Sequence, residues 1–160
     1  MAVTKDQKTI RFGTPDGHQP MAQPVKASAQ LYAGTIALTA SGYAKSAATV
    51  ANTDICWGLY NGLLNGTPTT STPITGGSTD GEIVVGIDTG SFYLQNGTSS
   101  DEITQADVGA LCYVIDEVTV GKTNGGSSRP VAGRIMSIGT AQYEGMIAVL
   151  LGNNQTTGSP

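Results

Sequence analysis

The stretch that decides the fold is DEITQADVGALCYVIDEVTVGKTNGGSSRPVAGR, residues 101–134. It holds an acidic turn, an apolar run with one of the two cysteines, and a glycine-rich turn before a second apolar run. Apolar, β-branched runs bounded by Gly, Asn and Ser are typical of strands joined by turns. We therefore expect a strand over 111–120, a turn over 124–128 and a second strand over 131–138.

Gly121-Lys122-Thr123 matches the end of a phosphate-binding loop, but its surroundings do not. Such a loop needs a glycine five residues before its Gly-Lys glycine and a helix after it, because backbone N–H groups surround the phosphates. Asp116 occupies the earlier position, and a turn follows over 124–128. The motif is interpreted as the end of a strand, and nucleotide binding is not expected.

The one helical signal covers 103–109. Thr104 can cap a turn, the Asp107 carboxylate can bond back to the cap N–H, and Gly109 can end the turn. We expect one or two helical turns at most. The preceding pair Asp101-Glu102 is interpreted as support for the helix dipole.

The remaining strand candidates lie on both sides of this stretch. They cover 31–39, 43–47, 55–60, 82–87, 91–94 and 145–151. Ser41-Gly42 suits a hairpin turn between the first two. Ile55, Trp57 and Leu59 alternate along 55–60, which predicts that they form its buried face, with the sole tryptophan as a core anchor.

Length and composition predict one β-rich domain with a thin core. The chain has 160 residues, 22 glycines, few aromatic residues and 12% charged residues, about half the usual charged share. Such a composition favours strands and tight turns, and a thin core gains stability by association with other copies. We expect an extended arm over 1–27, a β-rich domain over 28–152 with a polar surface loop at 61–80, and a polar tail over 153–160.

Charge is distributed unevenly along the chain. The net charge is −4, which argues against general nucleic-acid binding. The first 27 residues hold four basic and two acidic residues, whereas the rest holds four basic and ten acidic residues. A mildly basic arm therefore precedes an acidic body, and the sequence leaves open whether this asymmetry arises by chance.

Residues for catalysis or for metal binding are scarce. The single histidine, His18, lies in the expected arm, where a preorganised catalytic base is hard to build. No Cys/His spacing fits zinc, and no Asp-rich loop fits calcium. Carboxylates that could in principle pair for glycoside chemistry are Asp88, Asp101, Glu102, Asp116 and Glu117. We expect no enzymatic activity, no cofactor and no metal.

The cysteines and the apolar runs indicate the cellular compartment in which the protein is made and used. Cys56 and Cys112 lie in separate apolar runs, so two buried free thiols are favoured over a disulfide. No stretch approaches the roughly 18 apolar residues of a membrane span, and the N-terminus lacks a signal-peptide core. We expect a protein that is made and used without secretion.

Five segments carry a resemblance to a known family. They are TKD at 4–6, PVKASAQLYAGTIALTASGYA at 24–44, GSFYL at 90–94, ITQADVGALCYVIDEVTVGKT at 103–123 and RPVAGRI at 129–135. The pattern resembles the head decoration, or structural cement, proteins of tailed bacteriophages, over most of 4–61 and 81–151. The stretch 67–79 is longer than usual for that family, and 152–160 adds a polar tail.

The resemblance implies a small β-barrel or β-tulip with one short helix. It also implies a homotrimer on the outer surface of the phage head, bound to the major capsid protein at three-fold and quasi-three-fold positions, which stabilises the shell against packaged DNA. Such a protein is assembled in the host bacterial cytoplasm and contacts neither nucleic acid nor membrane directly. We expect the arm to contact the capsid protein through Lys5, Lys8, Arg11 and Phe12, and one mode for this contact is the addition of a strand to the sheet of the capsid protein.

Two other functions remain open. A trimeric receptor- or carbohydrate-binding virion protein would contact host-surface glycans through the loop at 61–80. An enzyme acting on glycans would show hydrolysis that depends on Asp116 or Glu117.

Overall fold

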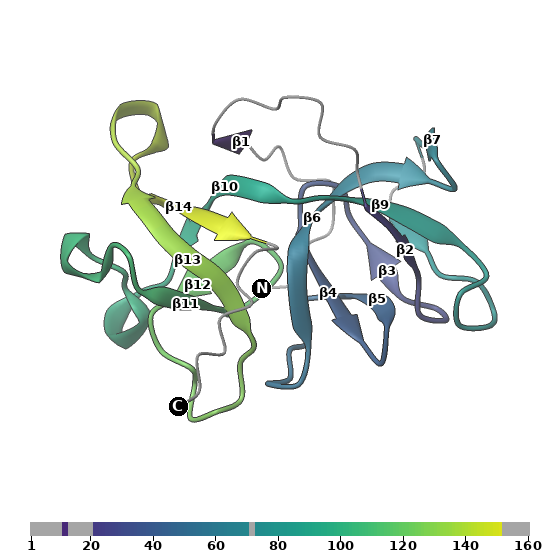
Figure 1. Cartoon of the computed structure of the whole chain (residues 1–160), viewed down its shortest axis with the longest axis horizontal. Helices are drawn as coiled ribbons and strands as arrows, with labels where there is room; N and C mark the ends of the chain where they lie inside the picture. Colours follow the sequence, from purple (N-terminus) through teal and green to yellow (C-terminus); the bar gives the residue numbers. More distant parts are fainter. Residues whose placement is uncertain (1–10, 13–20, 71–72, 152–160) are drawn as a thin grey trace.

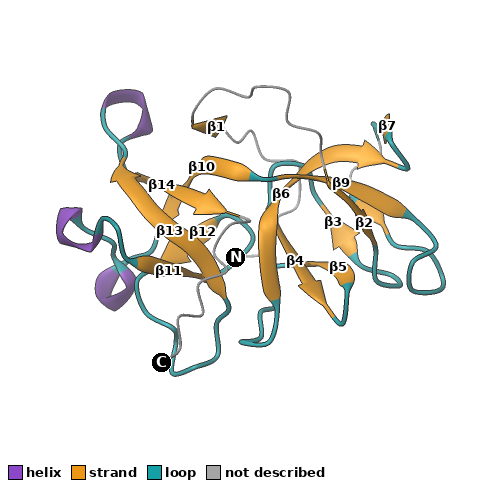
Figure 2. Cartoon of the chain, viewed as in Figure 1, coloured by secondary structure: helices purple, strands orange, loops and turns teal. Residues whose placement is uncertain are grey.

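The structure, a computed structural model, describes residues 11–12, 21–70 and 73–151. These residues form two β lobes that lie side by side (Figure 1). Helical structure in the described residues is limited to three 3₁₀ turns (Figure 2), which are η1 (Ser99–Asp101), η2 (Gln105–Asp107) and η3 (Ala141–Tyr143). The expected mainly β fold with a barrel is confirmed.

The first lobe is a closed barrel of five strands. In order around the barrel they are β10 (Gly90–Asn96), β12 (Thr119–Gly121), β11 (Leu111–Val114), β13 (Val131–Ile138) and β14 (Met146–Leu151). β14 pairs back onto β10, which closes the barrel, and β10–β12 is the one parallel pair in it. Closure pairs the strand edges that an open sheet would expose.

The second lobe is a strongly curved sheet. Its order is β2 (Met21–Pro24), β9 (Val84–Asp88), β6 (Ile55–Leu64), β4 (Ile36–Ala40) and β5 (Tyr43–Ser46). The two ends of this order meet, because the Lys26 N–H donates to the Ala44 carbonyl at 2.9 Å beside a Val25–Ala44 bridge. The smaller strands are β3 (Gln30–Leu31), which pairs with β8 (Ile74–Thr75), and β7 (Thr67–Pro68), which pairs with β6.

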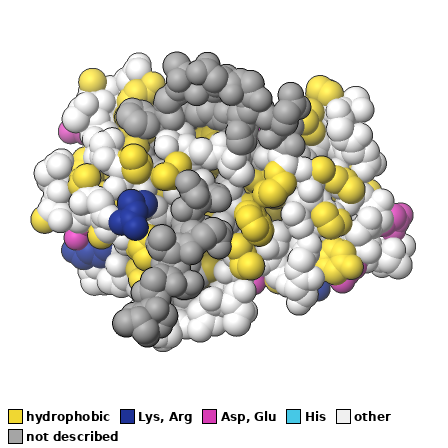
Figure 3. Space-filling model, in the orientation of Figure 1, with side chains coloured by type: hydrophobic (Ala, Val, Ile, Leu, Met, Phe, Trp, Pro, Cys, Tyr) yellow, Lys and Arg dark blue, Asp and Glu magenta, His cyan; other side chains and the backbone are white. Residues whose placement is uncertain are grey.

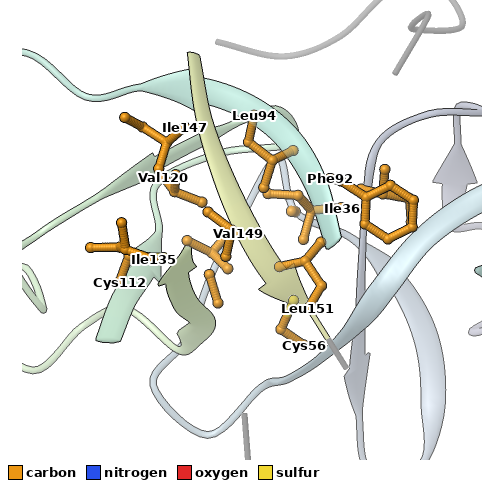
Figure 4. Packing of buried hydrophobic residues seen from close by; sticks show 14 of the residues in the cluster. Ile36, Cys56, Phe92, Leu94, Cys112, Val120, Ile135, Ile147, Val149 and Leu151 are labelled. Atoms are coloured by element: carbon orange, nitrogen blue, oxygen red, sulfur yellow. The ribbon is translucent and has the colours of Figure 1, made fainter. Parts of the chain in front are cut away.

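Both lobes share one core. Ile36 and Leu38 of β4 and Cys56 of β6 belong to the same buried cluster as the inner residues of the barrel (Figure 4). A second cluster, which includes Tyr60 and Ile87, lies within the second lobe. The barrel core is therefore completed by one face of the neighbouring sheet, and the lobes form one packed unit.

Most of the expected strands are present. The hairpin around Ser41-Gly42 is confirmed as β4–β5, and the strands expected at 82–87, 91–94, 131–138 and 145–151 are β9, β10, β13 and β14. The strand expected over 31–39 is instead two, β3 and β4, because Gly34 has a φ of 80° and the chain turns there.

The strand expected over 111–120 is a hairpin. β11 ends at Val114, and β12 returns beside it from Thr119. The Asp116 carboxylate closes the turn by accepting hydrogen bonds from the N–H groups of Val118 at 3.0 Å and Thr119 at 2.9 Å. An aspartate that bonds N–H groups two and three residues ahead stabilises a turn even within an apolar sequence.

The buried face predicted for β6 is confirmed for Leu59, which is 3% exposed, and is wrong for the other two residues. Ile55 is 45% exposed and Trp57 is only half-buried, whereas Cys56 and Tyr60 are buried. The β4–β6 register shifts beside Trp57, and a bulge of this kind interrupts the alternation of faces along a strand. Trp57 lies at the margin of the second cluster and donates through its indole N–H to the Thr39 hydroxyl at 2.9 Å.

Two segments expected to be irregular contribute strands. The arm expected over 1–27 ends earlier, because 21–24 form β2 and Val25 is fully buried. The loop expected at 61–80 contains the end of β6 together with β7 and β8, and Gly76 donates to the Ala29 carbonyl at 2.7 Å. Residues 71–72 and the expected tail at 153–160 lie outside the described residues.

Replacing Tyr60 by Phe tests the second cluster. The buried Tyr60 hydroxyl donates to the Lys45 carbonyl at 2.7 Å, so its loss leaves a buried carbonyl without this donor. We expect Tyr60→Phe to lower the free energy of unfolding by about 1–2 kcal/mol in urea titrations. The control Tyr43→Phe removes a half-buried hydroxyl and should change it by less than about 0.5 kcal/mol. Equal losses in both variants would contradict the assignment.

Candidate functional site

Two described residues of the arm pair with a strand of the barrel. Arg11 and Phe12 form β1 (Arg11–Phe12), which pairs antiparallel with β10, Arg11 opposite Phe92 and Phe12 opposite Ser91. The structure describes the backbone of these two residues, and Lys5 and Lys8 lie outside the described residues. Of the four residues expected to contact a partner, two are thus brought to the edge of β10.

The position of β1 follows from how β10 is paired. One side of β10 is covered by β14 from Gly90 to Gln95. On the other side β12 pairs only at Gln95 and Asn96, and β1 pairs at Ser91 and Phe92. β1 therefore lies on the part of the β10 edge that the barrel itself leaves uncovered. A two-residue pairing makes few hydrogen bonds, each worth about 1 kcal/mol net.

The motif Gly121-Lys122-Thr123 is the end of β12, as the sequence predicts. The Asp101 carboxylate accepts hydrogen bonds from the Thr123 hydroxyl and from the Arg129 guanidinium, the latter at 2.8 Å. The Lys122 N–H also donates to the Asp101 carbonyl at 3.1 Å. Asp101 lies in the first turn of η1, and its side chain in addition connects the two ends of the 122–129 turn.

The short helical segment is confirmed as a single 3₁₀ turn. The Asp107 carboxylate accepts from the Thr104 N–H at 2.7 Å and from its hydroxyl at 2.9 Å, and these bonds lower the pKa of Asp107. Gly109, with a φ of 92°, ends the turn and donates to the Ile135 carbonyl. Glu102 is exposed, and its side chain bonds to no other described residue.

The other candidate carboxylates are used in holding the fold. Asp88 accepts from the Asn61 amide at 3.1 Å, and Asp116 closes the β11–β12 turn. Glu117 is only 2% exposed and accepts from the Ser46 hydroxyl at 2.5 Å, which links the barrel to β5 of the second lobe. This link was not predicted, and the only signal for it in the sequence is an acidic pair within an apolar run.

The two cysteines are free and buried in the shared cluster. Burial raises the pKa of Cys112 to about 12 and raises the pKa of Cys56 further, so both thiols stay protonated near neutral pH. A protonated buried thiol is a poor nucleophile. The arrangement therefore fits a structural role for both residues.

A metal site is not found among the described residues. Within residues 11–12, 21–70 and 73–151, no three His, Cys, Asp or Glu side chains gather as a metal site, and His18 lies outside these ranges. None of the helical segments in this part of the chain could cross a membrane. In comparisons with known proteins, no family model, curated protein or solved structure matches.

The Asp101 cluster predicts a dependence of stability on pH. Hydrogen bonding by Arg129, and then by Thr123, lowers the pKa of Asp101 below its usual value of about 4. The ionised group therefore contributes stability that is fully present above about pH 4 and is lost as the pH falls through the lower folded value. We expect Asp101→Asn to lower the free energy of unfolding at pH 7 by about 1–2 kcal/mol.

The matched control is the neighbouring residue. Glu102→Gln removes the same charge from an exposed side chain and should leave the unfolding curve unchanged at both pH 7 and pH 3. Denaturant titrations across this range measure both variants. If Asp101→Asn kept the full acid dependence of the wild type, the assignment to Asp101 would be wrong.

Proposed function

We propose that this chain is a non-enzymatic capsid decoration protein that binds the outer surface of a phage head as trimers at three-fold and quasi-three-fold positions. Its partner is the major capsid protein, and its role is to hold adjacent capsid subunits together against the pressure of packaged DNA. The resemblance of 4–61 and 81–151 to head decoration proteins supports this proposal, and so does the β-barrel fold.

The observation that carries the proposal is the position of β1. This strand belongs to the mildly basic arm, and its described residues pair with Ser91 and Phe92 at the edge of β10. Each backbone hydrogen bond in such a pairing is worth about 1 kcal/mol net, so a pairing of this length can be exchanged for one with a partner sheet. An arm that leaves this edge can add a strand to the sheet of a capsid protein, which is a common mode of peptide recognition.

The rest of the described chain suits a rigid structural subunit. The carboxylates that could serve a hydrolase, such as Asp116 and Glu117, are engaged in turn and inter-lobe hydrogen bonds. Weak contacts that are repeated by linked copies around a closed shell gain strength through effective concentration. A trimer with three arms therefore needs only modest affinity in each arm.

Deletion of residues 2–12 tests the role of the arm. This deletion removes β1, which contains Arg11, and the two basic residues before it, Lys5 and Lys8, but keeps β2, which begins at Met21. We expect occupancy on expanded, undecorated heads to fall at least tenfold in a sedimentation binding assay, while the unfolding curve changes little. Deletion of 153–160 is the control and should leave occupancy unchanged.

Two results would contradict the proposal. Unchanged occupancy after deletion of 2–12 would remove the arm from the contact. Copies confined to the tail tip or fibres in an electron cryo-microscopy reconstruction of the intact particle would exclude a role on the head surface.

A further inference from the structure

Three of the cations in the described part of the chain are paired with acidic residues within it. Lys26, Lys45 and Arg129 each form an ion pair with an aspartate. Two other exposed cations, Lys122 and Arg134, form no such pair among the described residues, and the guanidinium of Arg134 donates to the Gly109 carbonyl. Among the described residues, no carboxylate lies within ion-pair distance of it.

Apolar side chains flank Arg134 on the outside of the barrel. In the strand register Leu111 of β11 is opposite Arg134 of β13, which is opposite Leu150 of β14. Directly opposed residues project from the same face of a sheet, and both leucines are half-buried. Met136, next to a register shift in β13, is 42% exposed. We call Leu111, Arg134, Met136 and Leu150 the Arg134 face.

The side chains of the Arg134 face indicate which kind of protein surface would bind to it. In Figure 3 hydrophobic and basic side chains lie close together over the barrel lobe. A cation without a carboxylate partner, set between two half-buried leucines and beside an exposed methionine, is complementary to an apolar surface that carries a carboxylate. Arg and Met are also enriched where proteins contact one another.

The chain itself presents such a carboxylate. Glu144 follows η3 in the connection between β13 and β14, which stands away from the barrel wall (Figure 2). Its side chain is exposed and bonds to no other described residue. The preceding Tyr143 stacks on Tyr93 of β10, with ring centroids 4.3 Å apart and 11° between the planes. This stacking fixes the connection, so Glu144 is presented on an ordered element.

Arg134 and Glu144 do not meet within one chain. β13 continues from Arg134 to Ile138, a distance of about 13 Å along the strand, before the connection that carries Glu144 begins. Arg134 of one copy can therefore pair with Glu144 of another copy. Glu102 is the other described carboxylate without a side-chain partner, but it lies in the short link between η1 and η2 and not on a projecting connection.

We propose that the Arg134 face binds the β13–β14 connection of a second copy, with Glu144 of that copy paired to Arg134. The two surfaces differ, so the contact is heterologous and can close into a ring such as a trimer. This inference rests on the trimer of the proposed function and names the surfaces that form it.

The test uses the isolated full chain and charge reversal. Sedimentation velocity at a series of concentrations measures the association of the wild type, Arg134→Glu, Glu144→Arg and the double variant. We expect each single reversal to weaken association roughly tenfold or more, because like charges then face each other, and the double variant to recover most of the loss. Lys26→Glu, an exposed cation on the second lobe, is the control and should associate as the wild type does.

Met136→Ser provides a second variant that leaves both charges in place. Met136 is exposed, so circular dichroism should show an intact fold while association weakens. A monomeric wild type, single reversals without effect, or a double variant as weak as the singles would each overturn the inference.

Head binding separates this inference from the proposed function. Arg134→Glu that associates normally but fails to bind heads would assign the Arg134 face to the capsid protein and overturn the inference. A wild type that associates through this face, with the double variant restored, yet does not bind heads would support the inference and contradict the proposed function.

Discussion

The packing of β4 and β6 against the barrel is the contact on which the rest of the structure depends. Five short strands enclose too little volume for a large core, and the chain has few bulky residues to fill it. Ile36, Leu38 and Cys56 add their buried side chains from outside the barrel. Burial of a residue of this size contributes about 1.5–3 kcal/mol, so this one face adds substantially to a thin core.

Hydrogen bonds to Glu117, in the turn between β11 and β12, also join the barrel to the second lobe. The Ile36 N–H donates to the Glu117 carbonyl at 2.8 Å, and the Ser46 hydroxyl donates to the Glu117 carboxylate. Thr89 alone separates β9 of the second lobe from β10 of the barrel. This one-residue connection restricts movement of one lobe relative to the other. The two sheets therefore behave as one body, and the surfaces on the barrel, the β1 strand and the Arg134 face, are held in fixed positions relative to the second lobe.

Local sequence patterns identified a strand correctly where the turn before it also contained recognisable turn residues. β13 and β14 follow runs that begin after Gly-, Ser- or Pro-containing turns, and their bounds agree with the expectation. The β11–β12 turn was missed because Ile115 and Val118 flank Asp116 and Glu117, so the apolar run looks continuous. Trp57 was misplaced because a bulge changes which side of β6 faces the core, and a bulge depends on the partner strand.

The sequence by itself determined the β class, the turn chemistry and the absence of a working phosphate loop, because these depend on residues close together in the chain. Only the tertiary structure decided that Asp101 pairs with Arg129, that Glu117 bonds to Ser46 and that β1 pairs with β10. Those contacts join segments far apart in the chain, and periodicity along one strand carries no information about which distant strand will lie beside it. The partner of each strand was set by which arrangement buries the shared core.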